Sequence, residues 1–224
     1  MKKALITLLL LGAASLTGGM PAPLSAQNPA HTTYWNQQET LFQSLPASPD
    51  DIIMLGNSIT DGGEWAELLG DPRIRNRGIS GDTTQGILDR LATITRGNPA
   101  KVFLLIGIND FAGGLTPDQI ARNIDLLIRR FRSESPATRL FVQSILPVND
   151  LIPAFPDHKQ HQAEIPAANA LIQELCQKHS VTYIDLYSHF VTGEGKMDAS
   201  YTNDGLHLLG PGYALWASLI KPLL

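Results

Sequence analysis

The chain has 224 residues, of which 43% are hydrophobic and 17% charged. This length suits one domain or at most two, with one favoured, and the composition argues against a disordered, collagen-like or coiled-coil chain. The single cysteine, Cys176, rules out an internal disulfide, a cysteine-rich zinc site and a cysteine-ligated iron–sulfur cluster. We expect Cys176 to be a small buried or half-buried hydrophobe on an amphipathic helix.

The first 26 residues have the pattern of a secretory signal peptide. Lys2 and Lys3 precede an apolar stretch over 4–14, and small residues follow up to Ala26. We therefore expect an exported protein, periplasmic or secreted. An uncleaved membrane anchor is the weaker alternative, because glycines and prolines within 18–23 interrupt any longer helix. No later segment approaches the roughly 18 apolar residues that a spanning helix needs.

The formal net charge is −4, and loss of residues 1–26 would remove two lysines and no acidic residue, leaving −6. The sequence contains no block of basic residues. The sequence is therefore a poor candidate for binding nucleic acid or anionic lipid, and stable membrane insertion is not expected. No oligomeric state follows from the composition.

Apolar segments alternate with amphipathic ones along the rest of the chain. A helix is expected first, at 34–45, with Tyr34, Trp35, Leu41, Phe42 and Leu45 on one side. Strands are expected at 51–55, 73–79, 101–106, 138–145 and 181–186, with helices at 62–69, 84–95, 117–133, 162–179 and 211–223. This alternation predicts one α/β domain over 27–224, in which helices cover both faces of a five-stranded parallel sheet in the order 2-1-3-4-5.

The turns after the first three strands carry the residues of greatest interest. They contain Ser58, Gly81 and Asn109, which are 23 and 28 residues apart, about one strand–helix repeat each. Because ligands bind beyond the carboxyl ends of the strands in such sheets, we expect the three turns to meet in space at a binding site.

A serine nucleophile needs a base within hydrogen-bond reach and a third group that orients the base. Asp204 and His207 lie three residues apart on an expected loop, so the carboxylate can accept the Nδ1–H of the imidazole while Nε2 faces Ser58. Three donors are available for the oxyanion of a tetrahedral intermediate. They are the backbone N–H groups of Ser58 and Gly81 and the side-chain amide of Asn109.

These segments resemble the four conserved blocks of the SGNH (GDSL-type) esterase/lipase family. The blocks are Gly-Asn-Ser-Ile at 56–59, Gly81 within Ile-Ser-Gly-Asp-Thr, Gly-Ile-Asn-Asp at 107–110 and Asp-Gly-Leu-His at 204–207, in the family's order. The resemblance implies a flavodoxin-like three-layer fold, Ser58 as nucleophile, His207 as base, Asp204 as its orienting acid, and Ser58, Gly81 and Asn109 as oxyanion donors. The stretch around Gly81 looks most like the branch of platelet-activating-factor acetylhydrolase subunits and bacterial acetylesterases.

One residue departs from the family pattern. Asn57 stands where the family usually has Asp before the serine. That Asp is not a member of the triad, and Asn is nearly isosteric with it, so we expect an altered local hydrogen-bond network and an intact nucleophile.

Three other groups of residues allow both a functional interpretation and a plainer one. Asp157, His158 and His161 have the chemistry of a metal site, but a solvated polar loop is favoured. Asp185 and His189 are a competing acid–base pair, although a packed strand end is favoured. The connection over 147–160 is long, and its apolar residues Leu151, Ile152 and Phe155 either cover the substrate cleft or form an ordinary surface loop.

The sequence thus predicts an exported serine esterase that needs no metal or organic cofactor. We expect it to remove a short acyl group, with acetyl favoured, from a carbohydrate or another small hydroxyl compound. A lipase, lysophospholipase or thioesterase of the same family is the nearest alternative. A noncatalytic carbohydrate-binding protein with the same fold is the alternative from another class. Because the base must be neutral, kcat/KM should rise with pH as His207 loses its proton.

Overall fold

The computed structural model describes residues 30–224, so the expected signal peptide of residues 1–26 lies outside the described chain. The strands are β1 (Ile52–Gly56), β2 (Ile74–Gly78), β3 (Lys101–Leu105), β4 (Arg139–Gln143) and β5 (Thr182–Ile184). The longer helices are α1 (Thr33–Ser44), α7 (Pro117–Glu134), α9 (Ile165–Lys178) and α11 (Gly210–Ile220). The shorter ones are α2 (Ser58–Asp61), α3 (Trp65–Leu69), α4 (Thr84–Asp89), α5 (Leu91–Thr95), α6 (Ile108–Ala112), α8 (Pro156–Lys159) and α10 (Tyr187–Phe190), with 3₁₀ turns at Gln162–Glu164 and Lys221–Leu223.

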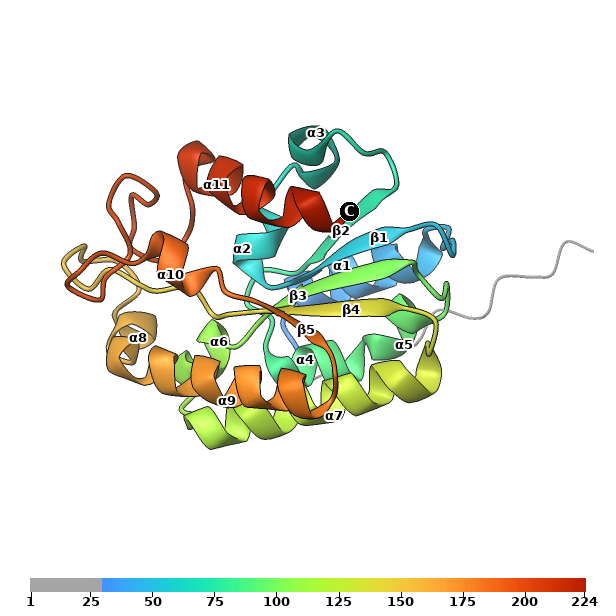
Figure 1. Ribbon diagram of the computed structural model, residues 1–224, viewed down its shortest axis with the longest axis horizontal. Coiled ribbons are helices and arrows are strands. Elements are labelled where there is room, and N and C mark those ends of the chain that lie inside the picture. The colour runs from blue at the N-terminus through green and yellow to red at the C-terminus, as the bar shows by residue number, and fades with distance from the viewer. Residues whose placement is uncertain (1–29) are drawn as a thin grey trace, which may run out of the picture.

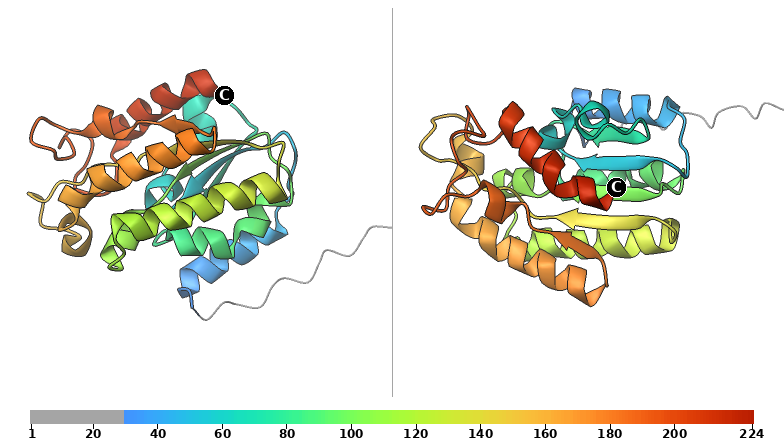
Figure 2. Two further views of the ribbon diagram at one scale, coloured as in Figure 1. Left: turned by 60° about the horizontal axis from the view of Figure 1, so that its bottom comes forward. Right: turned by 45° about the horizontal axis from the view of Figure 1, so that its top comes forward.

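The sheet has the predicted topology. Its strands are parallel and lie in the order β2-β1-β3-β4-β5 (Figure 1). Helices α3 and α11 cover one face, and α4, α5, α7 and α9 cover the other (Figures 1 and 2). The predicted three-layer α/β fold is therefore confirmed, with both faces of the parallel sheet shielded from water, as parallel sheets require.

The central strands are buried on both sides, which fixes their ends relative to one another. Every residue of β1 is buried, as is every residue of β3 after Lys101. The rings of Phe103 and Phe141 stack between β3 and β4 with their centroids 4.5 Å apart. In register, Gly56 at the end of β1 pairs with Gly78 of β2 and Leu105 of β3. The turns after these three strands therefore begin at one edge of the sheet.

The predicted helices are broadly correct, but their details differ. The segment over 84–95 divides into α4 and α5 at Arg90, whose backbone is not helical (φ −106°, ψ 11°). The guanidinium group of Arg90 donates to the buried carboxylate of Asp82. Three short helices, α6, α8 and α10, were not predicted, because four or five residues are too few to show a helical period. Together with α2, they lie at the end of the sheet where β1 and β3 finish (Figure 1).

The predicted apolar side of the first helix is partly wrong. Trp35 and Phe42 are buried and form a small cluster with Ile79, against which Leu45 packs. Tyr34 and Leu41 are 40% and 48% exposed. The helix lies against α5 at the edge of the domain, so only a narrow stripe of its surface is covered.

Among the described residues, no helix combines the length and apolar character needed to cross a membrane.

Candidate active site

Ser58 is the first residue of α2, directly beyond the end of β1. Asn57 caps this helix: its Oδ1 accepts the backbone N–H of Ile59 at 3.0 Å. Asn57 is fully buried, and its Nδ2 has no hydrogen-bond acceptor in the described part of the chain. Its Oδ1 therefore makes the capping contact at the position where the family usually has Asp.

Two glycines let α2 lie directly on the ends of the strands. A Cβ at Gly56 would overlap the Thr60 hydroxyl and the Leu105 carbonyl, and a Cβ at Gly78 would overlap the backbone of Asp61. The absence of these two side chains brings the first turn of α2 against β1 and β2. The Ser58 side chain consequently sits at the rim of the sheet and is half-buried.

His207 and Asp204 reach Ser58 from the segment before α11. The Oγ of Ser58 lies 3.0 Å from His207 Nε2, and His207 Nδ1 lies 2.7 Å from Asp204 Oδ2. The other carboxylate oxygen of Asp204 accepts the backbone N–H groups of Leu206 and His207, both at 2.8 Å. The turn is tight at Gly205, where φ is +82°. The three side chains thus have the spacing of a serine–histidine–aspartate triad.

Hydrogen bonds favour the charged form of the Asp204 carboxyl group. Partial burial raises the pKa of its carboxyl, but the His207 ring and the two backbone N–H donors outweigh burial and hold the pKa below its usual value. Asp204 is therefore ionised at neutral pH and accepts a hydrogen bond from the Nδ1–H of His207. With that nitrogen occupied by a proton, Nε2 presents its lone pair to the Ser58 hydroxyl.

The three expected oxyanion donors are free to bind a ligand. In residues 30–224, the backbone N–H groups of Ser58 and Gly81 have no hydrogen-bond acceptor. Gly81 adopts φ +83°, a conformation that favours glycine, and is exposed. Asn109 uses one Nδ2 hydrogen on the carbonyl oxygen of Asp82 at 2.7 Å, which leaves the second hydrogen available.

A buried ion pair that was not predicted from the sequence supports the turn that carries Gly81. Asp82 accepts from Arg90 Nε at 2.8 Å and from Trp35 Nε1 at 3.0 Å. Arg90 also donates to the carbonyl oxygens of Gly56 at 3.2 Å and Arg77 at 2.9 Å. In the sequence, the pair is visible only as two opposite charges eight residues apart, and only the fold shows that both side chains are buried.

A second unpredicted contact joins the turns after β2 and β3. Asp110 accepts the backbone N–H of Thr84 at 3.0 Å and also its hydroxyl, while Asn123 of α7 donates to the same hydroxyl at 2.7 Å. Burial raises the pKa of Asp110 to about 6, although the hydrogen bonds from Thr84 act in the opposite direction. This contact connects the first turn of α4 to α6, the helix that holds Asn109.

The interpretation of His158 as a residue of a solvated loop is wrong. His158 belongs to α8, and its Nε2 lies 3.0 Å from Asn109 Oδ1. His161 instead pairs with Glu164 at 2.8 Å, and Asp157 is exposed. The described residues contain no group of three or more His, Cys, Asp or Glu side chains placed so that they could hold a metal ion together.

The other minor candidates follow the plainer interpretations. Asp185 caps the backbone of Ser188 at 3.1 Å rather than pairing with His189, which is exposed. Cys176 is fully buried on α9, and burial raises the pKa of its thiol to about 12. The thiol is therefore an inert core group, as predicted.

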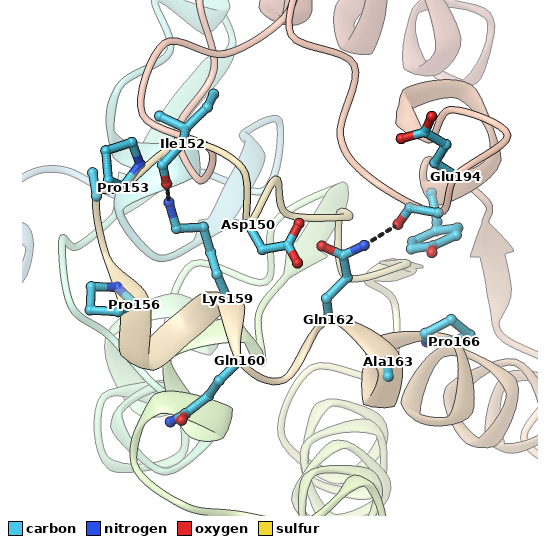
Figure 3. A pocket seen from close by; sticks show the side chains of 13 residues that line it. Asp150, Ile152, Pro153, Pro156, Lys159, Gln160, Gln162, Ala163, Pro166 and Glu194 are labelled. Carbon is cyan, nitrogen blue, oxygen red and sulfur yellow. Dashed lines mark hydrogen bonds between the residues drawn. The ribbon is translucent and has the colours of Figure 1, made fainter.

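The connection over 147–160 reaches the triad through one of its three apolar residues. The ring of Phe155 lies edge-on to His207, with centroids 5.1 Å apart. Ile152 lines a neighbouring cavity of about 740 Å³, whereas Leu151 is 72% exposed and does not line it. Figure 3 shows this cavity, which is bordered by prolines and by Tyr187 together with the polar side chains of Asp150, Lys159, Gln160, Gln162 and Glu194.

The cavity is adjacent to the triad but does not include it. Neither Ser58 nor His207 lines it. Lys159 joins the two regions: its ammonium group donates to the carbonyl oxygen of Ile152 (Figure 3) and, at 3.2 Å, to that of Asp204.

Comparisons with known proteins agree with this geometry. A sequence model of the GDSL-like lipase/acylhydrolase family matches residues 54–215. The Homo sapiens platelet-activating factor acetylhydrolase IB subunit alpha2 is 27% identical over 209 residues, covering 90% of this chain and 86% of its own. A solved structure from Streptococcus pneumonia, named for platelet activating factor, has a TM-score of 0.75 at 28% identity and covers 85% of this chain and 90% of its own.

A GDSL-like lipase from Bacteroides thetaiotaomicron has a TM-score of 0.73 at 25% identity, covering 84% of this chain and 96% of its own. The family match extends from β1 to α11 and so spans all four of the blocks identified in the sequence. The chain therefore belongs to the GDSL-like lipase/acylhydrolase family and is an ester hydrolase.

Proposed function

We propose that the chain is an exported serine esterase in which Ser58, His207 and Asp204 act as the catalytic triad. The observation that carries this proposal is the continuous line of contacts from Ser58 Oγ to His207 Nε2, at 3.0 Å, and from His207 Nδ1 to Asp204, at 2.7 Å. His207 Nε2 removes the proton of the hydroxyl as its oxygen attacks the ester carbonyl. Asp204 keeps the imidazole oriented and stabilises the imidazolium that forms.

The negative charge of the tetrahedral intermediate falls on the former carbonyl oxygen. The N–H groups of Ser58 and Gly81 and the second Nδ2 hydrogen of Asn109 are the donors that would bind it. Removing one such donor typically lowers kcat by about 10²- to 10³-fold. His207 then protonates the departing alcohol, and water attacks the acyl-enzyme by the same base-assisted step, which restores Ser58.

The substrate proposed is a short acyl ester, with acetyl favoured, on a carbohydrate or similar hydroxyl compound. One support is the similarity to proteins named acetylhydrolases. A second is the cavity of about 740 Å³ next to Phe155, because its mixture of Tyr187, prolines and polar side chains suits a sugar ring that presents both hydroxyl and C–H faces. Export is proposed from the composition of residues 1–26.

A chain-length series tests the acyl preference. Hydrolysis of p-nitrophenyl acetate, butyrate and octanoate should give the highest kcat/KM with acetate. Preference for octanoate would favour the lipase alternative. Acetylated sugars should be deacetylated by the wild type and not by Ser58→Ala, whereas long-chain phospholipids should remain intact. N-terminal sequencing of the protein secreted by a bacterial host tests export, with removal of residues 1–26 expected.

A further inference from the structure

We propose that His158 is a positioning residue for the oxyanion hole. His158 holds the side-chain amide of Asn109 so that the free N–H of this amide faces the substrate. This inference rests on the proposed function. The contact that carries it is the 3.0 Å distance between His158 Nε2 and Asn109 Oδ1.

Contacts at both ends of the Asn109 amide restrict its orientation. The χ2 torsion of asparagine is broad and nearly two-fold, so a single contact still allows the amide to tilt about this bond. The carbonyl oxygen of Asp82 accepts from Nδ2 at 2.7 Å, and His158 donates to Oδ1 at the opposite end. A flipped amide would place its oxygen against the Asp82 carbonyl, where no proton is available to join them. The two contacts together therefore select one orientation.

This arrangement requires neutral His158 with its proton on Nε2, since Asn109 Oδ1 only accepts. The other nitrogen, Nδ1, is buried and has no partner in the described chain, so a second proton there would find no acceptor. Burial lowers the pKa of His158, and the nearby His207 and His161 lower it further, against the opposing effect of Asp157. A neutral donor adds no positive charge next to the imidazolium that forms on His207 during attack.

The surrounding structure holds His158 in place. It lies on α8, which packs against α6, the helix that begins one residue before Asn109. The ring of Phe155 is edge-on to both His158 and His207, at 5.9 Å and 5.1 Å. The neighbouring Lys159 is 4% exposed and donates to the carbonyl oxygen of Asp204. The segment that carries His158 is thus attached to the loop that carries the triad acid and base.

The test compares variants that keep the ring volume or the donor of His158. His158→Phe keeps a ring without an N–H, and His158→Gln places an N–H near the position of Nε2. His161→Phe is the matched control, because His161 lies on the same segment and stacks on Phe111, and its hydrogen bond is to Glu164 and not to Asn109. Should the Phe variant fail to fold, His158→Met supplies a chain of similar volume without a donor.

With p-nitrophenyl acetate, His158→Phe should lower kcat by about 10- to 100-fold, the scale of effect expected from small errors in catalytic geometry. KM should stay within threefold, and the midpoint of the pH–rate profile should not move. His158→Gln should recover kcat to within a few-fold of the wild type, and His161→Phe should match the wild type. A structural role alone would instead lower the Phe and Gln variants equally.

Unchanged kcat in His158→Phe, or an equal loss in the Phe and Gln variants, would overturn the proposal. Labelling by a fluorophosphonate separates this failure from failure of the proposed function. If wild-type Ser58 is labelled and His158→Phe keeps full kcat, only the positioning role is lost. If wild-type Ser58 is not labelled, the triad itself is refuted and the positioning role with it.

Discussion

Arg90 and Asp82 form an ion pair within the core, directly under the turn that carries Gly81. The two groups are 2.8 Å apart, and their side chains are 0% and 1% exposed. Arg90 also donates to the carbonyl oxygens of Gly56 and Arg77, at or next to the ends of β1 and β2. The pair therefore connects the ends of β1 and β2 to the turn that carries Gly81.

Replacement of Arg90 by Met should destabilise the protein by about 3–5 kcal/mol, because it leaves the Asp82 carboxylate buried without its partner. Arg73→Met breaks an ion pair of 2.7 Å with Asp71, but the arginine side chain is 53% exposed, so the loss of stability should be much smaller than for Arg90→Met. Urea unfolding of both variants measures the difference. Equal losses would contradict the structural importance assigned to the buried pair.

Asp110 should make stability depend on pH in an unusual direction. Its pKa is raised to about 6 in the folded protein, so the folded chain holds a proton that the unfolded chain has released. The associated stability is present below about pH 4 and is lost as pH rises through 6. Its size is about 3 kcal/mol, from a pKa difference of about two.

Asp110→Asn removes this titration, so the free energy of unfolding of the variant should increase relative to the wild type between pH 4 and pH 7.5. Urea unfolding at several pH values gives that difference. The absolute stability of the variant also reflects its altered bonds to Thr84, which is why the pH dependence is the informative quantity. A difference that is constant over the range would show that Asp110 has an ordinary pKa.

Phe155 and Leu151 should differ in their effect on turnover. Phe155 is 42% exposed but lies edge-on to His207, whereas Leu151 is 72% exposed. Loss of an aromatic contact of about 0.5–1.5 kcal/mol predicts a roughly 2- to 13-fold lower kcat/KM for Phe155→Ala. Leu151→Ala should stay within twofold of the wild type. Equal effects on every ester tested would show that Phe155 has no special role at the cleft.

Much of the fold could be predicted because its signals are local. Each strand is a short apolar run, and the strands alternate with helices, which restricts the sheet to a parallel arrangement. The exposure of Tyr34 and Leu41 could not be predicted, because it depends on how little of α1 the rest of the domain covers. The short helix α8 has too few residues to show a period, yet it brings His158 to the site.

The candidate site was predictable to a different degree for different residues. Ser58, Asn109 and the Asp204–His207 pair stand in turns of distinctive composition, and the structure brings Ser58, His207 and Asp204 into contact. The supporting contacts join residues far apart in sequence. His158 and Asn109 are 49 residues apart, and nothing in the chain around either one indicates the other.

The most direct test of the central claim is the identity of the nucleophile. The wild type, treated with a fluorophosphonate and digested, should carry the label on the peptide that contains Ser58, and Ser58→Ala should take up no label. Hydrolysis of p-nitrophenyl acetate should fall by about 10⁴-fold or more in Ser58→Ala, with circular dichroism unchanged. Label on another residue, or wild-type turnover by Ser58→Ala, would contradict the account.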